Sequence, residues 1–499
     1  MSEADSSSDG ILTARQRRSL TRRPRDSTIT VVLAITGLVA AFTQTLVTPI
    51  IPRLPALLDA TPDDATWVLT ATLLAAAISI PIAGRLGDMF GKRRLIVVLL
   101  GALVLGSIIC ALSTTVIPMI AGRVLQGVSI GVVSLGISIL RDVLHPKSLG
   151  GAVALVSATL GVGAAVGLPI AALIAQNLDF HYLFWLATLL GLACLVLVLA
   201  IVPVSTLRSG GRFDFVGAFG FGVGLVSILL AISKGGSWGW ASPVTLGLLA
   251  GGIVVLVLWG LFELRTADPL IDLRVAARRP VLLTNLTSIT IGFGFFVSTA
   301  VFPDLLEAPT SSGAGLGLSL ILASLCLTPL GIVMFVMSPV AARLTAARGP
   351  RTSLILGASA VVVAFAVAVV LHGAVWHVIL VSTIVGIGVG ISYAAMPTLI
   401  MNAVPPTETA AANGLNSVMR ALGSTIAATV GGLVLASGSV ITHGVAAPAD
   451  GAYRTMFIIA AGILLAGVVV AAFIPRRSKR YGQTQSIPIQ QVPGRQGES

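Results

Sequence analysis

The feature that most constrains this chain is a series of long apolar segments that recurs from one end of the sequence to the other. The 499 residues have a mean hydropathy of +1.00 and only 10% are charged, against about 25% in a soluble domain. A bilayer core of about 30 Å requires about 20 apolar residues in a helix, and lipid offers no partners for unpaired backbone groups. The composition therefore predicts an all-α, polytopic membrane protein.

Fourteen segments are long and apolar enough to cross a bilayer. They are residues 29–51, 66–84, 94–113, 115–140, 150–175, 182–203, 214–232, 244–264, 280–302, 316–340, 352–371, 375–399, 411–436 and 453–474. An even number places both termini on one side, and 26 of the 31 Lys and Arg residues then fall on that side. Only Arg53, Lys234 and Arg454 fall in loops on the other side. Because Lys and Arg accumulate in cytoplasmic segments, we expect both termini in the cytoplasm.

The net charge of +12 follows from the same asymmetry. Basic loops that face the anionic leaflet are stabilised there, so the charge does not indicate nucleic acid as a partner. The bilayer itself is the expected partner, and nothing in the sequence predicts an oligomer, so we expect a monomer. The abundance of Arg, Ala and Gly is typical of a GC-rich bacterial genome and favours a bacterial plasma membrane as the location.

The sequence contains an internal repeat. Shifted by 258 residues, IPIAGRLGDMFGKR (80–93) aligns with SPVAARLTAARGPR (338–351), and each segment joins two predicted spans on the inner side. Duplicated halves are a common construction of secondary transporters. The second segment has Ala346 where the first has Asp88, so only one of them keeps the acid.

The repeat predicts two six-helix bundles, residues 29–203 and 280–475. Residues 204–279 lie between them and predict two inserted helices with a polar cytosolic linker, which we expect on the membrane surface. Residues 1–28 and 476–499 are basic segments that we interpret as cytosolic tails, the first of them disordered.

The segment GRLGDMFGKRRL, residues 84–95, concentrates one acid, four bases and three glycines in an otherwise apolar region. Gly84 and Gly91 suit a tight loop and a close approach of helices, and Lys92 and Arg93 suit the anionic membrane surface. Asp88 is placed to pair with a base or to cap the N-terminus of a neighbouring helix. The cluster predicts a latch that holds the inner side closed. The alternative is a positively charged anchor with a turn.

These residues resemble a known signature. GRLGDMFGKRRL resembles the loop between helices two and three of the major facilitator superfamily. In the fourth span, Arg123 and Gln126 belong to an Arg-x-x-Gln-Gly sequence that resembles a second signature of that superfamily. The resemblance implies two bundles that work by alternating access.

The fifth span carries GVGAAVGLP, in which Gly163, Gly167 and Pro169 resemble the antiporter signature of drug exporters. The pattern departs from the family at Leu168, which separates a glycine and proline that are adjacent there. With fourteen helices, the chain is similar to the drug:proton antiporter branch, which implies a proton gradient as the energy source and no cofactor. The alternative for these glycines is ordinary close packing of helices.

Two arginines lie inside predicted spans. Burying an Arg at the centre of a bilayer costs at least ~2.5–3.5 kcal/mol, so each should face the interior of a bundle. For Arg123 we favour a role in substrate binding or coupling, with an alternative role in tying helices together through carbonyl groups. For Arg420, which is close in sequence to Asn413 and Asn416, the two roles remain equally open.

Proton coupling normally uses a carboxylate that is alternately exposed and buried. In the antiporter branch the first span usually has an acid shortly before its last proline, whereas this chain has Thr43 and the neutral Gln44 there. The remaining candidates for a proton site are Asp88 on the inner side, and Asp304 and Glu307 near the outer end of the ninth span.

The uncharged polar residues within the spans suit a lipophilic, small amphipathic substrate in a mostly apolar pocket. They are Gln44, Gln126, Asn285, Tyr393, Asn413 and Asn416. We expect a secondary-active exporter of lipophilic drugs or antibiotics. The alternatives are a dedicated exporter of one metabolite, lipid or amino acid, and a membrane sensor or scaffold that does not transport. An enzyme and a metal site are not expected, because no cluster of His, Cys, Asp and Glu or phosphate-binding loop is present.

Overall fold

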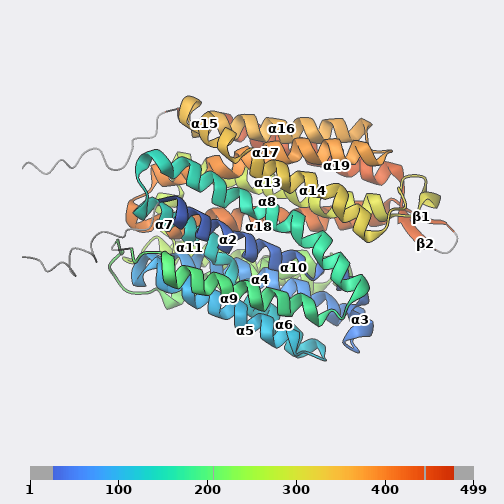
Figure 1. Ribbon diagram of the computed structural model, residues 1–499, viewed down its shortest axis with the longest axis horizontal. Coiled ribbons are helices and arrows are strands. Elements are labelled where there is room, and N and C mark those ends of the chain that lie inside the picture. The colour runs from blue at the N-terminus through green and yellow to red at the C-terminus, as the bar shows by residue number, and fades with distance from the viewer. Residues whose placement is uncertain (1–25, 206, 443–444, 477–499) are drawn as a thin grey trace, which may run out of the picture.

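The structure is a computed structural model that describes residues 26–205, 207–442 and 445–476. Its long helices run side by side along one axis (Figure 1). The turns at Gly91 and Gly349 lie at one end of the molecule, the turn end, and a β-hairpin lies at the other, the hairpin end. The tails predicted at 1–28 and 476–499 fall almost entirely outside the described residues.

The first bundle is built from six membrane-spanning segments. They are α2 (Asp26–Thr45), α4 (Pro62–Phe90), α5 (Lys92–Ala111), α6 (Val116–Val128) with α7 (Val132–Val143), α8 (Pro146–Asn177) and α9 (His181–Ile201). A short 3-10 turn, Ser129–Gly131, joins α6 to α7, so these two helices form one interrupted span. The short helix α3 (Leu54–Leu57) precedes α4 at the hairpin end.

The second bundle repeats this arrangement. Its helices are α13 (Arg279–Glu307), α14 (Leu320–Val336), α15 (Ser338–Arg348), α16 (Pro350–Val370), α17 (Val375–Ala403), α18 (Thr409–Ser437) and α19 (Asp450–Ala472). Helices α14 and α15 meet at a bend of 42° and together are long and apolar enough to form one span. With that pair counted once, the described residues contain the fourteen spans that the sequence predicts.

Two inserted helices, α10 (Phe215–Trp238) and α11 (Pro243–Glu263), lie between the bundles in sequence. Helix α10 packs against both α4 and α18, so it covers a junction of the two bundles. The linker that follows contains the short helix α12 (Leu273–Ala276). Leu270 and Ile271 of this linker are 1% and 4% exposed and join an apolar cluster with α4, α10 and α18. The expectation of a linker resting on the membrane surface was therefore wrong for these apolar residues.

Each bundle contacts the other through its own central helix. Helix α8 packs against α14, and α18 packs against α4 (Figure 1). Glycines allow both approaches: a Cβ at Gly331 would lie 2.5 Å from the carbonyl oxygen of Gly161, and one at Gly84 would lie 2.7 Å from that of Ala410. Small residues let helix backbones come this close in membranes.

The structure differs from the sequence prediction at several helix ends. Helix α10 continues to Trp238, so Lys234 lies in a helix and not in an outer loop. Lys234 is 3% exposed, donates to the Thr66 hydroxyl at 2.5 Å and lies 5.0 Å from the ring centre of Trp67. An apolar run shows only how many residues cross the hydrocarbon core of the bilayer. The length of a helix that continues beyond that core is therefore underestimated from hydropathy.

A hairpin at the hairpin end was not predicted. Strands β1 (Ser439–Thr442) and β2 (Val445–Pro448) pair antiparallel between α18 and α19. A strand of four residues has too few alternating apolar and polar residues to be recognised from the sequence, particularly next to long apolar helices.

Candidate functional site

The turn after α4 is a single residue, Gly91, with φ of +108°. Helix α4 continues to the residue before it and α5 begins at the next, so the loop expected at 85–94 is mostly helical. Only Gly91 uses the conformational freedom of glycine. Gly84 is helical and serves the close approach to α18 instead.

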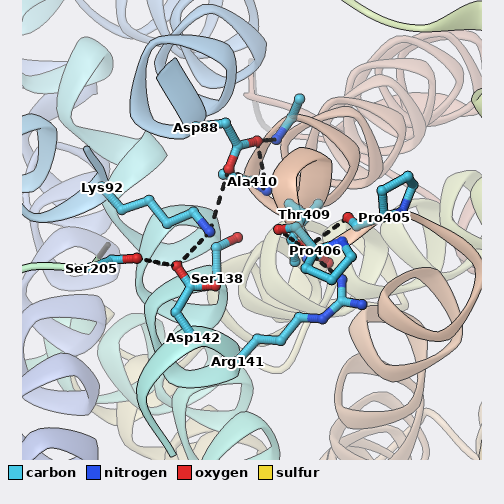
Figure 2. Close-up of polar contacts among 12 residues, drawn as sticks. Asp88, Lys92, Ser138, Arg141, Asp142, Ser205, Pro405, Pro406, Thr409 and Ala410 are labelled. Carbon is cyan, nitrogen blue, oxygen red and sulfur yellow. Dashed lines mark hydrogen bonds and ion pairs between the residues drawn. The ribbon is translucent and has the colours of Figure 1, made fainter. Parts of the chain in front are cut away.

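The carboxylate of Asp88 caps the N-terminus of α18, a helix of the other bundle (Figure 2). It accepts hydrogen bonds from the N–H groups of Ala410, at 3.1 Å, and Ala411, at 3.0 Å. The first N–H groups of a helix lack partners within the helix and carry partial positive charge, so a carboxylate is stabilised there. Since Asp88 is 1% exposed, this contact joins the bundles at a place closed to water.

A buried chain of charges continues from Asp88 into the first bundle. The ammonium of Lys92 lies 3.4 Å from a carboxylate oxygen of Asp88 and 2.7 Å from one of Asp142 on α7. Ser205, which follows α9, donates to Asp142 at 2.6 Å. We call Asp88, Lys92 and Asp142 the Asp88 cluster. One ammonium serves two carboxylates here, so the N-terminus of α18 is an important second partner for Asp88.

A second polar contact between the bundles lies beside the Asp88 cluster. The guanidinium of Arg141 on α7 donates to the Thr409 hydroxyl at 2.5 Å (Figure 2). It also donates to the Val404 carbonyl at 3.3 Å. Thr409 donates in turn to the carbonyl of Pro406 at 3.0 Å. Both contacts hold the start of α18, so the bundles meet at the turn end around one helix terminus.

The second copy of the turn has the same backbone and a different surface. Gly349, with φ of +83°, separates α15 from α16 as Gly91 separates α4 from α5. Ala346, in the position equivalent to Asp88, is exposed and so is Arg343. Helix α15 packs against α8, and Ala341 and Ala154 belong to one apolar cluster there. This second junction is apolar where the first is charged.

One basic residue keeps the same contact in both copies. Arg93 donates to the Leu199 carbonyl at 2.6 Å, and Arg351 donates to the Ala472 carbonyl at 2.6 Å. Each acceptor lies near the end of the last helix of its own bundle. Arg93 therefore ties α5 to α9 within the first bundle and does not contact the second.

Arg123 lies on α6 and is 0% exposed. Its guanidinium donates to the Thr43 carbonyl of α2 at 3.1 Å and the Val68 carbonyl of α4 at 3.4 Å, and pairs with the side-chain oxygen of Gln126 at 2.6 Å. Gln126 donates to Ser107 of α5 at 2.8 Å. The guanidinium thus connects three helices through carbonyl groups, which is the geometry of the tying role. One of its terminal nitrogens, Nη2, has no hydrogen-bond partner among the described residues.

The two polar residues near the end of α2 are placed differently. Thr43 is 0% exposed, and its hydroxyl donates to the Ala40 carbonyl of its own helix at 2.8 Å. Gln44 is half-buried, and its amide nitrogen has no partner in the described part of the chain. Of the two, only Gln44 keeps a free hydrogen-bonding group for a ligand.

A polar cluster of the second bundle surrounds Arg420 on α18. Its guanidinium donates to Asn416 and Ser417 and lies 5.0 Å from the ring centre of Tyr393 on α17. Asn416 donates to the side-chain oxygen of Asn285 at 3.0 Å. Arg420 is half-buried, unlike Arg123. We call Asn285, Tyr393, Asn416 and Arg420 the Arg420 cluster.

Asn413 lies one turn nearer to the start of α18. It is 3% exposed and donates to the Thr409 carbonyl at 3.0 Å, while its side-chain oxygen has no donor among the described residues. In the described part of the chain, Asn413 thus bonds within α18 and to neither the Asp88 cluster nor the Arg420 cluster.

The glycines of α8 are packing positions on two sides of that helix. A Cβ at Gly163 would lie 2.6 Å from the Cβ of Ala41, and one at Gly167 would meet the Thr45 hydroxyl, both on α2. Gly161 faces Met334 of α14 in the other bundle. Pro169 lies inside α8. Helix α8 thus packs closely against helices of both bundles. This geometry agrees with the alternative that its glycines serve ordinary helix packing.

The two outer acids lie in the last turn of α13 and are both exposed. Asp304 accepts a hydrogen bond from the Tyr453 hydroxyl of α19 at 2.7 Å. They are far in sequence and structure from the Asp88 cluster, because α13 ends at the hairpin end.

A family model described as Major Facilitator Superfamily matches residues 33–428 and, in a second match, residues 284–492. The chain belongs to the Major Facilitator Superfamily. It is therefore a multi-pass membrane transporter and not an enzyme. The two overlapping matches agree with the internal repeat, because the second half is matched again from residue 284 onward.

Relatives in the superfamily include named multidrug transporters. "Multidrug resistance protein 3" of Bacillus subtilis is 25% identical over 74% of this chain and 72% of its own length. "Multidrug resistance protein B homolog" of Mycobacterium tuberculosis is 25% identical over 83% of this chain and 84% of its own. Among solved structures, the human organic anion transporter MFSD10 (TETRAN) has a TM-score of 0.62 at 16% identity, covering 90% of this chain and all of that one. This likeness shows the major facilitator fold alone.

The sequence analysis did not single out several residues of the candidate site. Asp142 completes the Asp88 cluster, and Arg141 and Thr409 form the second contact between the bundles. The sequence does mark two of them, because Arg141 and Asp142 are adjacent charged residues directly after a long apolar run. Among the described residues, no group of three or more His, Cys, Asp or Glu side chains is placed to hold a metal ion.

Proposed function

We propose that this transporter exports lipophilic drugs or antibiotics across a bacterial plasma membrane by alternating access, driven by a proton gradient. In this proposal, the turn end and both chain termini face the cytoplasm. The names of the multidrug relatives support the substrate class, and the concentration of bases in the segments of the turn end supports the orientation.

The observation that carries the proposal is the capping of α18 by Asp88. In the described conformation, the carboxylate of one bundle holds the first N–H groups of a helix in the other, so the turn end is closed. Hydrogen bonds to a charged group contribute about 1.5–3 kcal/mol each. A latch of that strength is large enough to favour the closed state and small enough to be opened during a transport cycle.

We propose that a proton acts on this latch through Asp88. Protonation would remove the charge that the N-terminus of α18 and Lys92 stabilise, so the closed state would lose its advantage. Asp88 fits this role better than Asp304 and Glu307, because those two side chains are exposed in the described conformation and lie at the other end of the molecule.

The Arg420 cluster is the proposed substrate contact in the second bundle. It combines a half-buried guanidinium with an aromatic ring and two amides, among apolar helices. A few polar groups in a mostly apolar setting suit an amphipathic molecule. The positive charge of Arg420 favours neutral and anionic substrates over cationic ones.

The experiment is transport in proteoliposomes with a panel of fluorescent lipophilic compounds that are cationic, neutral or anionic, with and without a pH gradient. We expect gradient-driven movement of more than one compound in the wild type and loss of movement in Asp88→Asn. Movement that ignores the gradient would contradict proton coupling. Transport of a single compound would indicate a dedicated exporter, and no transport would indicate a sensor or scaffold.

A further inference from the structure

A cavity of about 410 Å³ lies at the turn end, next to the Asp88 cluster but separate from it. Helix α4 contributes Arg85 to its wall, the linker after α9 contributes Arg208 and Ser209, and the start of α18 contributes Glu408. The linker before α13 closes another side with Asp268–Asp272. The volume is within the range of small-ligand sites, about 300–1,000 Å³.

Arg85 is a buried cation that no described group neutralises by contact. Its residue is 8% exposed, its Nε has no hydrogen-bond partner, and no carboxylate among the described residues lies within ion-pair distance of it. The two terminal nitrogens of its guanidinium are not among the buried atoms without a partner, so they open toward the cavity. A cation held in such a confined place is stabilised by a counter-ion. Its position on the cavity wall therefore suits an anion in the cavity.

Other groups on the wall add hydrogen-bonding capacity for an anion. The hydroxyl of Ser209 is buried and has no partner among the described residues. Arg208 is exposed and lines the same cavity. A guanidinium fork with a hydroxyl beside it matches the oxygens of a phosphate group.

Two of the three acids on the wall are engaged with backbone groups, and none forms an ion pair with Arg85 among the described residues. Asp268 accepts the N–H of Arg212 at 3.1 Å, and Asp272 accepts the N–H of Arg274 at 2.9 Å, so both are engaged with the backbone of the linkers. Glu408 remains: it is half-buried and attracts Arg85 electrostatically, but no ion pair joins the two side chains among the described residues.

We propose that this cavity binds a phosphate group, carried by an anionic lipid headgroup or by a soluble compound, with Arg85, Arg208 and Ser209 as ligands. The site is distinct from the substrate path of the proposed function. A ligand bound there contacts α4 and α18 together with both linkers, so its occupancy stabilises the closed turn end. The binding test below does not depend on transport.

The test is thermal unfolding of the full chain, purified in detergent and depleted of lipid. The probes are inorganic phosphate, compared with chloride at equal ionic strength, and nanodiscs of phosphatidylglycerol, compared with phosphatidylcholine. We expect a higher melting temperature with at least one of the two probes. Stabilisation by inorganic phosphate indicates a soluble ligand, and stabilisation by phosphatidylglycerol alone indicates a lipid headgroup.

Substitutions locate the effect. Arg85→Gln should weaken the apparent affinity for the active probe about tenfold or more, and Arg85→Lys should keep part of it. Arg208→Gln changes an exposed side chain, so it should fold normally and still weaken binding. Arg94→Gln removes an exposed base of the same segment and should change nothing.

Glu408→Gln separates the proposal from a direct pair between Arg85 and Glu408. Binding of the probe should be kept or strengthened, because a negative charge beside the anion is removed. The proposal is overturned if Glu408→Gln abolishes the effect, if Arg85→Gln and Arg208→Gln both bind like the wild type, or if neither probe stabilises the wild type.

Discussion

The two copies of the turn share a backbone and differ in what surrounds it. Gly91 and Gly349 both have positive φ between two helices, and the arginines two residues later both bind a carbonyl of the last helix of their bundle. Around Gly91, however, Asp88 and Lys92 are buried and Asp88 reaches the other bundle, whereas around Gly349 Arg343 and Arg348 are exposed. The comparison separates the parts of the motif that build the turn from the parts that join the bundles.

One charged junction and one apolar junction give the molecule two unlike contacts between its bundles. The contact of α18 with α4 includes a buried carboxylate, whereas that of α8 with α14 and α15 is made by glycine, alanine and methionine. We infer that a proton or a charge change acts on the first junction and leaves the second in place. The following predictions test this difference, in order of decreasing effect.

Lys92→Gln should have the largest effect on stability. The variant leaves two buried carboxylates without their shared ammonium, and breaking a buried ion pair costs about 3–5 kcal/mol. Chemical or thermal unfolding in detergent measures the loss. The matched control is Arg348→Gln beside the second turn, which is exposed and should change stability by less than about 0.5 kcal/mol. Equal losses in the two variants would refute the difference between the copies.

Asp88→Asn should shift the equilibrium between the closed and open turn end. Loss of the charge-assisted bonds to α18 removes about 2 kcal/mol from the closed state, which is roughly a thirtyfold change in population. We expect transport in proteoliposomes to fall at least about tenfold while membrane insertion stays normal. Ala346→Asn is the control at the equivalent position of the second copy, and transport at the wild-type rate is expected there.

Gly91→Ala and Gly349→Ala should have equal effects on stability, because both copies need the same backbone conformation. A non-glycine residue in such a region costs about 1–3 kcal/mol. Melting temperatures of the two variants in one detergent provide the measurement. A loss in only one of them would mean that the second turn is not a structural copy of the first.

Arg93→Gln and Arg351→Gln should have the smallest effects of the series. Each removes one hydrogen bond to a carbonyl at the edge of a bundle, at most about 1–2 kcal/mol. Both variants should keep transport, since neither arginine contacts the other bundle. A transport defect in Arg93→Gln with normal stability would extend the latch beyond the Asp88 cluster.

Much of the fold follows from local features of the sequence. Apolar segments of membrane length predict the spans, and the repeat at a spacing of 258 residues predicts both turns, because glycine at 91 and at 349 is a local requirement. The sequence was less informative about helix ends. It suggested a loop over 85–94, although α4 continues through most of that range, because charged residues are compatible with a helix that leaves the hydrocarbon.

The site was only partly predictable for a different reason. Asp88 was expected to pair with a base or cap a helix, and the sequence offered no means to name its partners. Ala410 and Ala411 lie more than 320 residues away and contribute only backbone N–H groups. Since almost every residue type has such a group, the residue types at these positions do not reveal the contact. Arg123 illustrates the same limit, because its partners in α2 and α4 are carbonyl groups.

The most direct test of the central claim is the distance between the bundles at the turn end. Spin labels at two exposed positions, Phe90 at the end of α4 and Pro406 directly before α18, report this distance by pulsed electron resonance in a variant whose three native cysteines are replaced by alanine. We predict one short distance in the substrate-free protein and a shift to longer distances in Asp88→Asn. An unchanged distance distribution in Asp88→Asn would contradict the account of Asp88 as the latch between the bundles.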